Sequence, residues 1–147
     1  MPKNPIAYVE IRVFAHATED ENKVIKAVQN LLPEDHLDEV TFRKTNLKGH
    51  HGNPILLLQT KIKKKEILNG LIEKISKNLS EIDKEVLKRE FDRHLEKGSV
   101  FLRFDKQAAF EGEIKTCSAD PIHVRLKFRK ERGKEIFQIC KEIGLLP

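Results

Sequence analysis

The residues from Ile122 to Phe128 alternate strictly between apolar and polar side chains, and this pattern constrains the fold more than any other stretch. Successive side chains of a β-strand point to opposite faces of a sheet. One face would carry Ile122, Val124, Leu126 and Phe128, and the other would carry His123, Arg125, Lys127 and, just beyond, Arg129. The chain therefore needs a sheet with one buried face and one face open to solvent.

Other stretches show the strand period or the helical period. The predicted strands cover residues 7–15, 39–47, 55–62, 100–104, 113–117 and 122–128, and the predicted helices cover residues 19–32, 63–79, 81–97 and 131–143. A capping box from Thr18 to Glu21 predicts the start of the first helix. Ser80 is expected to cap the third helix, and Gly98 to end it. Gly49, Gly52 and Pro54 predict a hairpin turn between the second and third strands.

The element order β-α-β-β-α-α-β-β-β-α predicts an α+β fold, with an antiparallel or mixed sheet and helices packed on one face. At 147 residues the chain is expected to form a single domain, 1–147. No apolar run is long enough for a membrane span, and the N-terminus lacks a signal-peptide pattern. The two cysteines have no spacing typical of a disulfide framework. These features predict a reduced, cytoplasmic protein.

Basic charge is concentrated near the C-terminus. Residues 121–134 contain six lysines and arginines and one acid, Glu131. The net charge of this segment is therefore +5, equal to the net charge of the whole chain. Clustered basic side chains favour a polyanionic partner, because each neutralised phosphate releases a counterion. A solvated lysine-rich and glutamate-rich surface would give a similar count.

Several further residues are candidates for contact with such a partner. Arg12 shares the open face by alternation. Arg103 lies near the end of the strand at 100–104, and Lys106 and Gln107 follow that strand in the same polar cluster. The glycines around His50 and Asn53 allow close approach of a phosphate to the backbone. Phe14, Phe101 and Phe110 lie on or near the faces opposite the core positions of their segments, where they either stack on bases or pack in the core.

Two alternatives to simple binding follow from the same residues. Asp105, followed by Glu113 and Lys115, resembles the acid and Glu-x-Lys pattern of metal-dependent nucleases. The sheet or an apolar patch also suits a protein-interaction adaptor. We found no nucleophile elbow, phosphate loop, dinucleotide fingerprint or zinc-protease motif. The prediction is a protein with no catalytic residue, no metal and no cofactor.

Three stretches resemble a family of archaeal RNA-binding proteins that are predicted exosome subunits. They are Arg12-Val13-Phe14-Ala15-His16-Ala17-Thr18-Glu19-Asp20, Gly49-His50-His51-Gly52-Asn53-Pro54-Ile55, and Arg103-Phe104-Asp105-Lys106-Gln107-Ala108-Ala109-Phe110-Glu111-Gly112. The family is similar to the ribosomal protein that binds 5S rRNA. The resemblance implies an α+β fold with an RNA-facing sheet, a role in RNA processing or ribosome-related assembly, and exosome or ribosome-assembly proteins as partners.

The sequence therefore predicts a non-catalytic RNA-binding domain that grips phosphates and recognises a structured RNA or a single-stranded loop. RNA is favoured over duplex DNA because no helix is both basic and free of an apolar stripe. The predicted RNA-contacting residues are Arg12, His50, Asn53, Arg103, Lys106, Gln107, His123, Arg125, Lys127 and Arg129. An adaptor of an RNA-processing complex is the first alternative, and a metal-dependent nuclease the second.

Overall fold

A six-stranded antiparallel sheet forms one layer of the protein in the computed structural model, which describes residues 4–49 and 52–147. The strands are β1 (Ile6–His16), β2 (Arg43–Lys48), β3 (Pro54–Ile62), β4 (Leu95–Glu96), β5 (Ser99–Phe104) and β6 (Ile122–Phe128). Their spatial order is β2-β3-β1-β6-β5-β4, and every neighbouring pair is antiparallel. The predicted α+β class is confirmed.

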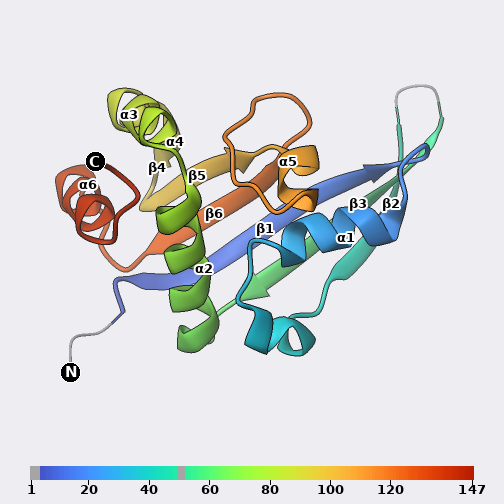
Figure 1. Cartoon of the computed structure of the whole chain (residues 1–147), viewed down its shortest axis with the longest axis horizontal. Coiled ribbons are helices and arrows are strands. Elements are labelled where there is room, and N and C mark those ends of the chain that lie inside the picture. Colours follow the sequence, from blue (N-terminus) through green and yellow to red (C-terminus); the bar gives the residue numbers. More distant parts are fainter. Residues whose placement is uncertain (1–3, 50–51) are drawn as a thin grey trace.

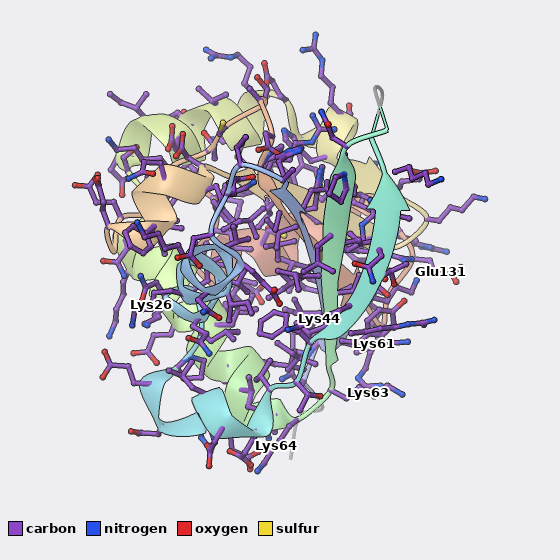
Figure 2. All side chains as sticks on the ribbon, turned by 90° about the vertical axis from the view of Figure 1, so that its right-hand side faces the viewer. Lys26, Lys44, Lys61, Lys63, Lys64 and Glu131 are labelled. Atoms are coloured by element: carbon purple, nitrogen blue, oxygen red, sulfur yellow. The ribbon has the colours of Figure 1, made fainter. Side chains whose placement is uncertain are left out.

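Helices form the second layer. They are α1 (Glu21–Gln29), α2 (Lys65–Asn78), α3 (Glu81–Arg89), α4 (Phe91–His94), α5 (Lys106–Phe110) and α6 (Gly133–Glu142), with a 3-10 helix, η1, at Glu34–Glu39. Figure 1 shows the helices in front of the sheet, and the view in Figure 2 places them to one side of it. One face of the sheet is therefore covered, and the other is left open.

The core lies between the two layers. Val9, Ile11 and Val13 of β1 are completely buried, and Val124 and Leu126 of β6 are at most 1% exposed. α2 buries its apolar stripe against this surface. The buried apolar side chains form one continuous cluster. None of the helices in the described parts of the chain has the length and apolarity that crossing a membrane requires.

The first helix begins later than predicted. Asp20, and not Thr18, is the N-cap of α1, and its side chain accepts a hydrogen bond from the Asn22 backbone N–H. Glu19 is the reason for the difference, because its carboxylate reaches back to accept from the backbone N–H of His16 at 3.0 Å. The helix ends at Gln29, and η1 occupies the segment before β2, whose start was predicted at residue 39 and lies at Arg43.

The predicted helix at 81–97 is interrupted at Glu90 and ends at His94, before its predicted end. Ser80 caps α3 as expected, accepting from the Asp83 backbone N–H at 3.1 Å, but α3 ends at Arg89. The chain continues through α4 into β4. Lys97 and Gly98 have φ values of 47° and 79°, so they form the tight turn of the β4–β5 hairpin. Gly98 therefore serves a hairpin and not a helix end, since two consecutive positive φ values are typical of such turns.

The predicted strand at 113–117 is also wrong, so the element order differs from the expected one. Residues 113–117 form one isolated β-bridge, between Thr116 and Phe104, and no strand. The residues before it form α5, whose N-cap Asp105 accepts a hydrogen bond from the Ala108 backbone N–H at 2.8 Å. The sixth strand of the sheet is instead β4.

Candidate nucleic-acid interface

The open face of the sheet is predominantly basic. Strand pairing and side-chain alternation place these residues on it: Arg43, Thr45 and Leu47 of β2, Ile55, Leu57, Gln59 and Lys61 of β3, Tyr8, Glu10, Arg12, Phe14 and His16 of β1, His123, Arg125 and Lys127 of β6, Ser99, Phe101 and Arg103 of β5, and Glu96 of β4. Glu10 and Glu96 are the acids among them. In Figure 2 Lys61 points away from the helices, whereas Lys26 of α1 lies on the helical side.

One line of residues across the sheet carries positive charge without an acid. Arg43, Gln59, Arg12, His123 and Arg103 are directly paired across β2, β3, β1, β6 and β5, and we call this set the arginine row. Adjacent strands lie about 4.8 Å apart, so the row spans roughly 19 Å. That length covers several nucleotides of a single strand. All three arginine side chains are exposed.

The side chains of the arginine row have no hydrogen-bond or ion-pair partner among the residues that the structure describes. Burial and then the neighbouring charges of Arg12 and Arg103 lower the pKa of His123, against a smaller opposing effect of Asp120. Cations that stand close together without ion-pair partners repel each other, and an anion laid across them would relieve the repulsion.

The other cations of β6 have partners within the protein. Arg125 donates to the hydroxyl of Ser99 at 3.0 Å and lies 3.7 Å from a carboxylate oxygen of Glu10. Lys127 donates to the carbonyl of Lys97 at 3.0 Å. Arg129, just after β6, donates to the carbonyl of Asn4 at 2.8 Å. The predicted basic strand is therefore present, but the unpaired charge runs across the strands and not along β6.

Two predicted contact residues, Lys106 and Gln107, lie on α5 in the helix layer. The ammonium of Lys106 donates to the Phe14 carbonyl at 2.7 Å, to the Glu19 carboxylate at 3.0 Å and to the Asp120 carboxylate at 2.8 Å. Gln107 donates to Glu111 at 3.0 Å. Because these side chains are engaged within the protein, they are not part of the interface that we propose.

His16, Glu19 and Asp120 form the one cluster in the described ranges that could hold a metal ion, and Lys106 contacts two of its members. Its ammonium sits between the two carboxylates where a cation would bind. Burial acts to raise the pKa of Asp120, but hydrogen bonds from Lys106 and His16 outweigh it and hold that pKa below its usual value. A protonated lysine therefore supplies the positive charge that the cluster needs.

The nuclease alternative gains no support from this arrangement. The Asp105 carboxylate is used to cap α5, and Glu113 forms an ion pair with Lys115 at 3.2 Å. Asp105 and Glu113 do not belong to any metal-ligating cluster in residues 4–49 and 52–147. Asn53 is exposed in the loop between β2 and β3, and the predicted contact of His50 lies outside the described residues.

Aromatic side chains share the open face with the cations. Phe14 and Phe101 lie there as the alternation indicated, both partly exposed. Tyr8 was missed, although its even-numbered position in the strand at 7–15 places it beside Glu10 and Arg12. Phe110 lies in the helix layer, with the Lys23 ammonium 5.9 Å from its ring centroid. Arg43 and Gln59 were missed because only strand pairing brings them to this face.

An antiparallel sheet with an open face that is basic and partly aromatic defines a class of protein suited to polyanions. The chain belongs to the RNA-binding family, whose model, described as "RNA binding", matches residues 8–128. It is 37% identical over 124 residues to RNA-binding protein PAB1135 of Pyrococcus abyssi, a match that covers 82% of this chain and 80% of that protein. The family predicted from the sequence motifs is thereby confirmed.

Solved structures of archaeal proteins share the fold. Protein AF2318 from Archaeoglobus fulgidus, of the DUF54 family, has a TM-score of 0.79 and 28% identity, covering 94% of this chain and 99% of that one. The DUF54 protein Mth689 from Methanothermobacter thermautotrophicus has a TM-score of 0.77 and 29% identity, covering 95% and 98%. The family match supports a non-catalytic RNA-binding role.

Proposed function

We propose that this protein binds RNA through the open face of its sheet, with RNA phosphates lying along the arginine row. The observation that carries the proposal is the alignment of Arg43, Arg12, His123 and Arg103 across four strands with no acid and no internal partner. Guanidinium groups bind phosphate through paired hydrogen bonds, so this arrangement suits a negatively charged backbone.

The helices α1, α2 and α6 do not offer a competing nucleic-acid surface of the kind that reads duplex DNA. α1, α2 and α6 each bury an apolar stripe in the core. A helix that enters the major groove needs a free, polar recognition face. Contacts from the arginine row to phosphates would supply affinity and orientation, whereas sequence preference requires contacts to bases.

The cellular setting that we propose is RNA processing or ribosome-related assembly, in association with the exosome or with ribosome-assembly proteins. The resemblance of the three motif stretches to predicted exosome subunits supports this setting. The name of the P. abyssi relative, an RNA-binding protein, supports RNA as the ligand. The protein would act there without catalysis, as a binding subunit.

Charge reversal with a matched control tests the proposal. The variant Arg12→Glu/Arg103→Glu changes the arginine row, and Lys26→Glu/Lys88→Glu makes the same change in net charge at exposed residues of α1 and α3. Binding of a labelled single-stranded RNA is measured across a salt series. Three phosphate contacts give a slope of log K against log salt of about −2, at about −0.7 per contact.

We expect the arginine-row variant to lose at least about tenfold in affinity at low salt and to reduce the slope to less than about −1 in magnitude. The control variant should retain most of the affinity. Equal losses in both variants would show that only net charge matters and would overturn the proposed site. No binding of the unchanged protein at low salt would overturn RNA binding and favour the adaptor alternative.

A further inference from the structure

We infer that the RNA bound on this face is single-stranded and that its bases stack on Tyr8 and Phe101. The inference rests on the proposed function and extends it to the class of RNA. It comes from an observation separate from the charges: aromatic rings are part of the same open face, next to the arginine row.

Tyr8, Arg125 and Phe101 form one continuous surface across three strands. The guanidinium carbon of Arg125 lies 5.9 Å from the centroid of the Tyr8 ring and 5.8 Å from the centroid of the Phe101 ring. Aromatic rings and guanidinium planes are the side-chain groups on which unpaired bases stack. The three groups therefore offer adjoining stacking positions.

This stacking surface lies beside the arginine row. Phe101 is two residues from Arg103 on β5, and Tyr8 is four residues from Arg12 on β1. These separations correspond to about 7 Å and 13 Å along the strands. A nucleotide carries its base one ribose away from its phosphate. A backbone that follows the arginine row can therefore place its bases over the rings.

Only unpaired nucleotides can use such a surface. In duplex RNA the flat faces of the bases are stacked on each other inside the helix, and proteins contact the minor groove, the 2′-hydroxyls and the phosphates. Rings in the open face of a sheet would gain nothing from a duplex. Their presence next to unpaired arginines favours a single strand or a loop.

Lys61 occupies part of this surface in the absence of RNA. Its ammonium lies 4.1 Å from the centroid of the Tyr8 ring. The lysine side chain is flexible and exposed, and its attraction to an exposed ring is weaker than stacking of a base on that ring. An incoming base can displace the ammonium, which is then free to pair with a phosphate.

Tyr8 provides a direct reporter, because the chain contains one tyrosine and no tryptophan. Protein fluorescence excited in the tyrosine band therefore comes from Tyr8 alone. We expect quenching when oligouridine binds, and little change when an abasic oligomer of the same length binds through phosphates only. Unchanged emission at saturating oligouridine would overturn stacking at Tyr8.

Affinity provides the second readout. Tyr8→Leu and Phe101→Leu should each weaken oligouridine binding by about tenfold, leave binding of the abasic oligomer unchanged and keep the salt slope. Tyr8→Phe, which keeps the ring, should bind oligouridine more tightly than Tyr8→Leu does. Phe110→Leu is the matched control, since that ring lies in the helix layer, and it should also bind normally.

The outcomes separate this inference from the proposed function. If the unchanged protein binds neither these oligomers nor an RNA duplex, the proposed function itself is wrong. If it binds both oligomers equally and Tyr8→Leu has no effect, RNA binding stands and base stacking is overturned. Tighter binding of a duplex than of oligouridine would likewise contradict the inference.

Discussion

The ammonium of Lys106 donates a hydrogen bond of 2.7 Å to the backbone carbonyl of Phe14 and so ties α5 to β1. The side chain of Phe14 points to the open face, whereas its carbonyl accepts from Lys106 of α5. Lys106 also bridges the Glu19 and Asp120 carboxylates, and its side chain is only 11% exposed. This lysine connects the two layers behind the candidate interface.

Replacing Lys106 by methionine should destabilise the fold by about 1–3 kcal/mol, because a carbonyl and two partly exposed carboxylates lose their donor. Lys63→Met is the control, since Lys63 is exposed and forms no hydrogen bond with the described residues. Urea unfolding compares the two. Equal stability of both variants would show that the Lys106 contacts contribute nothing to the fold.

The pKa of His123 predicts tighter RNA binding in mild acid. Its pKa is below 6.5, because of burial and of Arg12 and Arg103, so the ring is neutral at neutral pH. Bound phosphates would raise this pKa and favour the protonated ring. Affinity should therefore increase as the pH falls from 7 through the lowered pKa. His123→Gln should remove that part of the pH dependence when binding is measured at constant ionic strength.

The same group predicts the opposite trend for the free protein. Between the unfolded pKa near 6.5 and the lower folded pKa, the unfolded chain binds more protons, so stability falls as the pH decreases. His123→Gln should make the unfolding free energy less dependent on pH in this window. A free protein that becomes more stable on protonation of His123 would contradict the pKa direction.

Gly70 in α2 predicts an exception to helix propensity. Alanine is favoured over glycine in a helix by about 1 kcal/mol, but a Cβ at Gly70 would lie 2.7 Å from both Cβ and Cγ of Pro33. Gly70→Ala should therefore destabilise the protein by about 1–3 kcal/mol through overpacking. In a Pro33→Gly background, which lacks both contacting atoms, the same substitution should be much less harmful, and thermal unfolding of the four proteins would measure this.

The sequence predicted local periodicity well because local periodicity depends on few residues. The alternation at Ile122–Phe128 and the cap at Ser80 are confirmed. The start of α1 was wrong because Glu19 has a competing partner in the backbone of His16. Gly98 was misread because a glycine with positive φ serves helix ends and hairpins alike, and only the pairing of β4 with β5 distinguishes them.

The site was predicted in part for a related reason. Alternation along β1 and β6 placed Arg12 and His123 on one face, but it cannot show which strands are neighbours. Arg43, Gln59 and Arg103 join them only through the strand order of the folded sheet. Lys106 was predicted as a phosphate contact because its partner Glu19 lies 87 residues away in the chain.

The alternation of side chains along β1 and β6 affects how the sequence of such a protein can diverge in evolution. Buried core residues alternate with solvent-facing residues along each strand. The two sets are interleaved in the chain, but their side chains lie on opposite faces of the sheet. A substitution at Arg12 or His123 leaves Ile11 and Val124 in place. Ligand preference can therefore diverge one position at a time while the architecture is inherited intact.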